Sequence, residues 1–173
     1  GLNGLVPITA YTKYMSVTDF AYGSTVRSAI KSKKATAALK NYGYTGSQKG
    51  DNVLWLESHD TFTTDPADGG SSNKLTKAQQ IVGWAVVGAR KDAPALYLVR
   101  TSCEELDVNP TLVSVKYDAL IGAPGAADTW KNNAVVAVNQ FKNEFVGQSE
   151  TIYTNGSLFF VQRGTTGMVI SNL

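Results

Sequence analysis

The sequence predicts an α/β fold in which short parallel strands alternate with helices. Three strand-then-helix segments follow one another, and this order is typical of parallel strands joined by crossover helices. In the middle segment, residues 53–56 form a continuous apolar run, the pattern of a strand buried on both faces. Residues 57–60 (Glu-Ser-His-Asp) follow directly, and α/β folds place their chemistry at the carboxyl ends of such strands. Residues 53–60 are therefore the predicted functional centre.

Length and charge limit the possible functions. The 173 residues, 43% hydrophobic and 17% charged, describe one ordinary globular domain with a core. The net charge of +2, from 16 basic and 14 acidic side chains, is too balanced for a nucleic-acid surface, so no nucleic-acid partner is expected. Basic residues do cluster at Lys31, Lys33 and Lys34, where we expect a solvated helix end.

The single cysteine and the lengths of the apolar runs exclude further classes. Cys103 rules out an internal disulfide and a multi-cysteine metal site. A passive thiol is favoured over a nucleophile activated by His59, the sole histidine. No apolar run approaches the length of a membrane span, so no membrane partner is expected.

The first strand-then-helix unit is expected near the start of the chain. Residues 14–20 are rich in β-branched and aromatic side chains and predict a strand. Gly23 and Ser24 are expected to break it, and the apolar spacing of residues 26–30 predicts a helix. Residues 41–52 form a predicted loop that leads into the central strand.

The next two units follow the same order. After a predicted loop at residues 63–73, residues 76–79 (Thr-Lys-Ala-Gln) have the form of a capping box. The helix is expected to run to Ala89 and to end before Pro94, and residues 95–99 predict a buried strand. The irregular residues 101–127 form a candidate functional loop.

The pattern changes towards the C-terminus. Asp128 is the expected N-cap of a helix that carries apolar residues from Val135 to Phe145, with Gly147 as its stop. Beyond it, short strands alternate with turns, and Asn155-Gly156 is a strong hairpin signal. We place a domain boundary near Gly147, which gives residues 1–147 and 148–173. The second part is too short to be a domain alone.

Several motifs carry a resemblance to a known family. Residues 55–60 (Trp-Leu-Glu-Ser-His-Asp) resemble the seventh-strand motif of the α-amylase family of glycoside hydrolases. Four further stretches match parts of the family in the right order, from its sixth strand and helix to its C-terminal β-sandwich: residues 14–29, 83–100, 130–143 and 162–172. The match is closest to secreted bacterial α-amylases.

The resemblance implies a fragment. Residues 1–147 would be strands six to eight of a (β/α)8 TIM barrel with their helices, and residues 148–173 the first hairpin of a C-terminal β-sandwich. Such a barrel needs at least about 200 residues. The family's nucleophilic Asp and acid/base Glu would lie upstream, and so would its calcium ligands. The resemblance therefore implies no cofactor in this chain, calcium in the full-length enzyme, and an extracellular location.

Two residues receive functional roles from the resemblance. Asp60 matches the third, transition-state-stabilising carboxylate of a retaining α-1,4-glucan hydrolase, and His59 matches its substrate-binding histidine. No metal ligand is assigned. Arg100 lies where chloride-dependent members hold chloride, a less favoured role here. Glu57 is either a site carboxylate or, preferably, the partner of a nearby Arg or Lys.

Other interpretations stay open. Three aromatic side chains are either sugar-stacking or core residues: Phe62, Tyr97 and Trp130. Asp19 lines the barrel mouth or serves a turn. The first hypothesis is a fragment of an enzyme, hydrolase or transglycosylase, that acts on starch, glycogen or maltooligosaccharides. The second is a non-catalytic half-barrel with a carbohydrate-binding or structural role. The third is a scaffold without function. The isolated chain is expected to be inactive and, without its N-terminal half-barrel, to self-associate.

Overall fold

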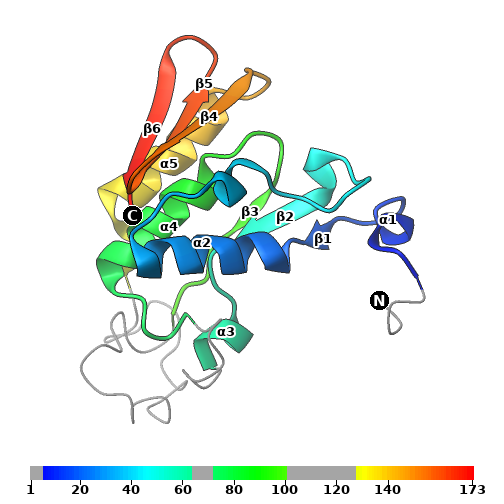
Figure 1. The fold of residues 1–173 in the computed structure, drawn as a ribbon, viewed down its shortest axis with the longest axis horizontal. Coiled ribbons are helices and arrows are strands. Elements are labelled where there is room, and N and C mark those ends of the chain that lie inside the picture. Colours follow the sequence, from blue (N-terminus) through cyan, green and yellow to red (C-terminus); the bar gives the residue numbers. More distant parts are fainter. Residues whose placement is uncertain (1–5, 64–71, 101–127) are drawn as a thin grey trace.

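The structure is a computed structural model that describes residues 6–63, 72–100 and 128–173 (Figure 1). It combines a parallel and an antiparallel three-stranded sheet with helices, which confirms the predicted mixed α/β class. The elements in order are α1 (Ile8–Tyr11), β1 (Val17–Thr18), α2 (Phe20–Ser32), η2 (Ala37–Lys40), η3 (Lys49–Asp51), β2 (Asn52–Trp55), α3 (His59–Thr63), α4 (Lys77–Gly88), β3 (Ala95–Leu96), η6 (Thr129–Lys131), α5 (Asn133–Glu144), β4 (Glu150–Asn155), β5 (Leu158–Arg163) and β6 (Gly167–Asn172). No helix within these ranges is long and apolar enough to cross a membrane.

The first sheet is parallel, as predicted, with the order β1-β2-β3. Val17 pairs with Asn52, and Leu54 pairs with Ala95. The outer strands are shorter than predicted, because only two residues of each segment pair with β2. The central strand therefore holds the sheet together.

Helix α2 begins earlier than the sequence suggested. The Asp19 carboxylate accepts a hydrogen bond from the Tyr22 backbone N–H at 2.9 Å, so the helix begins at Phe20. The predicted break at Gly23 is wrong, since this glycine lies inside α2. A Cβ atom there would lie 2.8 Å from the Trp55 carbonyl oxygen. Glycine allows the helix to approach β2 closely. The lysines at the end of α2 are exposed, as expected: Lys31, Lys33 and Lys34.

Helix α4 confirms the predicted capping box. The Thr76 hydroxyl accepts from the Gln79 N–H at 3.2 Å, and the Gln79 side chain accepts from the Thr76 N–H at 3.0 Å. Gly83 faces Leu56, whose Cδ1 would lie 2.5 Å from an added Cβ. The buried Leu54 and Leu56 thus join β2 to the helical layer.

The prediction that Asp128 caps the next helix is wrong. Asn132 caps α5, because its side chain accepts from the Ala134 N–H at 2.9 Å. Asp128 instead pairs with Lys77 at 3.1 Å and joins the two helix starts. Gly147 follows the end of α5 and has φ +77°. This left-handed conformation is typical of a glycine that ends a helix, as predicted for Gly147.

The last three strands form an antiparallel sheet in the order β4-β5-β6. Gly156 has φ +60° in the first turn, and the predicted hairpin is confirmed. Figure 1 places this sheet next to α5, at the opposite end of the view from α3. Phe159 and Val161 belong to the same apolar cluster as Val87 of α4 and Val138 of α5. The core is thus continuous on both sides of Gly147, and the domain boundary there stays a prediction.

A buried ion pair connects the helical layer to the antiparallel sheet. The Arg90 Nε and Nη2 atoms donate to Glu150 Oε1 at 3.1 and 3.0 Å. The guanidinium also donates to the Tyr22 hydroxyl and to the carbonyls of Leu39 and Lys40, the latter two at 3.0 and 2.8 Å. Burial raises the pKa of Tyr22 to about 12, although Arg90 acts in the opposite direction. One guanidinium therefore joins α2, η2 and β4 to the end of α4.

Replacing Glu150 tests this connection. Glu150→Ala leaves the buried Arg90 charge without its carboxylate, and we expect the free energy of unfolding in urea to fall by about 3 kcal/mol. Glu144→Ala removes an exposed carboxylate on α5 and serves as the matched control, with an unchanged unfolding midpoint. Equal stability of the two variants would contradict the connecting role of Arg90.

Candidate functional site

An open cleft of about 510 Å³ lies where the three parallel strands end. Thr18, Trp55 and Leu96 are the last residues of β1, β2 and β3, and residues 57–60 and 97–98 follow β2 and β3 in the cleft lining. The carboxyl ends of parallel strands meet at one edge of a sheet, where α/β folds bind ligands. The cleft thus contains the sequence-predicted functional centre.

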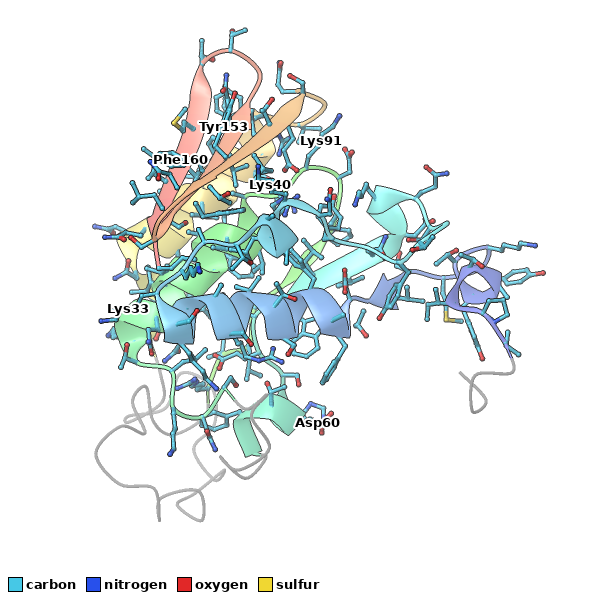
Figure 2. All side chains as sticks on the ribbon, in the orientation of Figure 1. Lys33, Lys40, Asp60, Lys91, Tyr153 and Phe160 are labelled. Atoms are coloured by element: carbon cyan, nitrogen blue, oxygen red, sulfur yellow. The ribbon has the colours of Figure 1, made fainter. Side chains whose placement is uncertain are left out.

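Local hydrogen bonds position the polar residues of the cleft. The Ser58 N–H donates to the Thr61 hydroxyl at 2.9 Å, and the Thr61 N–H donates to the Ser58 hydroxyl at 3.3 Å. This reciprocal pair fixes the first turn of α3, which contains His59 and Asp60. In Figure 2, Asp60 lies on α3, across the helices from Tyr153 and Phe160.

His59 and Asp60 form an exposed pair in the cleft. The distance between His59 Nε2 and Asp60 Oδ1 is 3.0 Å, and the side chains are 84% and 78% exposed. A ligand in the cleft can therefore reach both groups. The two residues predicted to form the site lie together and are accessible.

Glu57 has a different environment. Arg100 Nη2 donates to Glu57 Oε2 at 2.7 Å, and Arg100 Nε lies 3.2 Å from both carboxylate oxygens. The side chain of Glu57 is 5% exposed and that of Arg100 is 0% exposed. The preferred interpretation of Glu57, as the partner of a nearby arginine, is confirmed.

Arg100 also donates hydrogen bonds to backbone carbonyl groups. Its guanidinium donates to the carbonyls of Ser72 and Leu75 at 2.7 and 3.3 Å, and it lies 4.7 Å from the centroid of the Phe62 ring. The negative Glu57 carboxylate already contacts the guanidinium and would repel a chloride ion beside it, which argues against the chloride-ligand role.

The three aromatic residues considered for sugar stacking lie in different environments. Tyr97 lines the cleft and packs edge-to-face on Trp84, with ring centroids 5.0 Å apart. Phe62 is 5% exposed and packs on Arg100, and Trp130 is not among the residues that line the cleft. Only Tyr97 is therefore placed to contact a ligand there.

The sequence did not predict Phe20 as a cleft residue, and Trp55, which lies within the predicted functional centre 53–60, also lines the cleft. Phe20 was assigned to a strand, but it is the first residue of α2. The available signal was Asp19, a good N-cap residue directly before it. Asp19 serves this turn and not the mouth of the cleft, because it is buried and also accepts from the Gly43 N–H at 2.5 Å.

Arg27 contacts the end of β2, next to the cleft. Its Nη1 donates to the Leu56 carbonyl at 2.7 Å, and its guanidinium lies 5.2 Å from the centroid of the Trp55 ring. Burial lowers the pKa of Arg27 to about 10, although the charge of Glu57 acts in the opposite direction. Arg27 thus stays protonated at neutral pH and fixes the end of β2.

Two predicted features lie outside the described residues: Cys103 with the candidate loop 101–127, and most of the loop 63–73. Within residues 6–63, 72–100 and 128–173, no group of three His, Cys, Asp or Glu side chains is arranged to hold a metal ion.

Comparison with known proteins shows that this chain matches a portion of an α-amylase. It is 34% identical over 167 residues to an α-amylase from Clostridium acetobutylicum strain ATCC 824. The match covers 95% of this chain and 19% of that protein, so the chain spans about a fifth of the relative's length. No protein-family model matches the chain.

The two carboxylates near the cleft are expected to differ in their effect on stability. Glu57→Gln leaves the buried Arg100 without its counter-charge, and we predict a loss of about 3 kcal/mol in the free energy of unfolding. Asp60→Asn changes an exposed group and should leave the unfolding midpoint in urea unchanged. A stable Glu57→Gln variant would show that the pair does not hold the edge of the sheet.

Proposed function

We propose that this chain is part of an endo-acting, retaining α-1,4-glucan hydrolase and contributes Asp60 and His59 to its substrate site. Homology with a portion of an α-amylase supports a glycoside hydrolase fragment. The observation that carries the proposal further is the exposed His59–Asp60 pair in the cleft at the carboxyl end of β2. Starch, glycogen and maltooligosaccharides are the proposed substrates.

The proposed chemistry divides between this chain and the rest of the enzyme. Retaining glycosidases use a nucleophile and an acid/base carboxylate about 5 to 5.5 Å apart, and positive charge develops on the sugar in the transition state. We assign both catalytic carboxylates to a segment upstream of this chain. Asp60 then stabilises the developing charge by preorganised negative charge, and His59 donates a hydrogen bond to a hydroxyl of the same sugar.

The proposed architecture is part of a (β/α)8 barrel. In this interpretation β1, β2 and β3 are strands six to eight, and α2 and α4 pack on their outer face. Thr18 and Leu96 lie on the other face and are exposed, Leu96 by 56%. A barrel buries its inner face with side chains of the remaining strands. An upstream half-barrel is therefore the proposed partner of this face, and self-association is expected without it.

The antiparallel sheet is proposed to begin a β-sandwich over residues 148–173. Its outer face carries Tyr153, Met168 and Ile170, which are 49%, 50% and 58% exposed. Sandwiches cover such a face with a second sheet. Calcium in the full-length enzyme and an extracellular location complete the proposal, and both follow from the family resemblance alone.

A non-catalytic carbohydrate-binding half-barrel is the second candidate. One observation favours it: within the described residues, Asp60 is the sole exposed carboxylate that lines the cleft, since Glu57 is held by Arg100. Tight binding of maltoheptaose by the isolated chain, in the micromolar range, would support this candidate over the fragment.

The role of Asp60 is tested in the longer protein that contains this segment. Asp60→Asn should lower kcat on maltoheptaose by at least about a hundredfold, because it removes charge that acts on the transition state. Asp92→Asn, which changes an exposed aspartate outside the cleft, is the matched control. An unchanged kcat for Asp60→Asn would remove this residue from the mechanism.

The isolated chain should not hydrolyse starch, because its cleft holds one of the three carboxylates that the proposal requires. Reducing-sugar release is measured for the purified 173-residue chain beside its Asp60→Asn variant, which reveals any contaminating amylase. Hydrolysis that depends on Asp60 in the isolated chain would show that the catalytic pair does not lie upstream.

A further inference from the structure

We propose that Phe20, packed on the buried Trp55, forms an aromatic wall of the cleft that stacks against a sugar ring beside His59 and Asp60. This inference rests on the proposed glucan function and names the surface that would recognise the apolar face of the sugar. The four residues come from three elements, the start of α2, the end of β2 and the start of α3, and all four line the same cleft.

Phe20 is the most exposed aromatic residue of the cleft. It is 57% exposed although it is the first residue of a well-capped helix. Its ring packs edge-to-face on Trp55, with centroids 5.4 Å apart and an interplanar angle of 67°. This packing covers one edge of the Phe20 ring and leaves more than half of the side chain accessible to a ligand.

The aromatic wall is held in place by Arg27. The guanidinium lies 5.2 Å from the Trp55 ring centroid and 6.0 Å from that of Phe20. It is itself fixed by the hydrogen bond to the Leu56 carbonyl. A ring held by cation–π contacts loses little further freedom when a ligand binds, which favours recognition.

The indole nitrogen of Trp55 is a probe of this wall. Trp55 is 6% exposed, and its Nε1 atom is buried without a hydrogen-bond partner among the described residues. The Nε1 of Trp84, by contrast, donates to Asn139 Oδ1 at 3.0 Å. The Trp55 indole therefore lies behind the Phe20 ring without a competing hydrogen bond, and its N–H signal reports on changes at the wall.

The composition of the cleft matches the chemistry of a pyranose ring. A pyranose has apolar C–H faces and hydroxyl groups around its edge, so it needs an aromatic surface and polar groups together. The cleft offers the rings of Phe20 and Trp55 with the imidazole of His59 and the carboxylate of Asp60. Its volume of about 510 Å³ lies within the usual range of ligand clefts.

The experiment follows the indole N–H signals of the 173-residue chain by NMR while maltoheptaose is added into the millimolar range. The chain has three tryptophans, and each signal is assigned with the corresponding Trp→Phe variant. We expect the signals of the Trp55 indole and the His59 imidazole to shift together. Trp130, which lies outside the cleft lining, should not shift.

Variants then test the wall itself. Phe20→Ala should weaken maltoheptaose binding at least about tenfold, because it removes apolar surface that the sugar buries. Phe20→Tyr keeps the ring and should retain binding. Ile170→Ala removes a side chain of similar exposure, 58%, on the distant antiparallel sheet and should leave binding unchanged.

The outcomes separate this inference from the function on which it rests. A shift of the His59 signal with no shift at Trp55 and no effect of Phe20→Ala would leave the glucan site intact and overturn the wall. A complete absence of shifts at His59 and Trp55 would overturn the wall, whereas the glucan function is decided separately by the kcat of Asp60→Asn in the longer protein. Unchanged backbone spectra of the variants show that each one is folded.

Discussion

The ion pair between Glu57 and Arg100 fixes the edge of the parallel sheet on which the cleft depends. The carboxylate follows β2 and the guanidinium lies four residues beyond β3, so the pair holds the two strand ends together. A buried ion pair stabilises a fold only when the remaining hydrogen-bonding groups of both side chains have partners. Arg100 meets this condition through the carbonyls of Ser72 and Leu75. The neighbouring Asp60 is exposed, so one short stretch supplies both a structural and an accessible carboxylate.

Buried arginines repeat this role elsewhere in the molecule. Arg27 connects α2 to the end of β2, and Arg90 connects the helical layer to Glu150 of the antiparallel sheet. Each guanidinium offers several donors in a fixed plane, which suits the carbonyl groups at the ends of short elements. Strands of only two residues, β1 and β3, contribute few ladder hydrogen bonds, so side-chain connections of this kind carry much of the order between elements.

The sequence predicted the parallel order of the strands, the capping box at Thr76 and the hairpin at Gly156, because each depends on local chemistry. It also brought His59 and Asp60 to the end of a buried strand, since the carboxyl end of β2 follows from chain order alone. Gly23 was misjudged because its role is a close approach to Trp55, a contact between segments that no local pattern reveals. For Phe20, the N-cap residue Asp19 was a local signal that α2 begins there, but the exposure of its ring in the cleft depends on where β2 and β3 end.

The central claim is that this chain supplies one part of a glucan hydrolase site whose catalytic pair lies upstream. Reconstitution tests it most directly: the 173-residue chain is refolded with the upstream segment of the longer protein, and hydrolysis of maltoheptaose is measured. The account predicts activity when both parts are present, none from either part alone, and a severe loss when the chain carries Asp60→Asn. Activity of the upstream segment alone, or a reconstituted Asp60→Asn enzyme as active as the unmodified one, would contradict it.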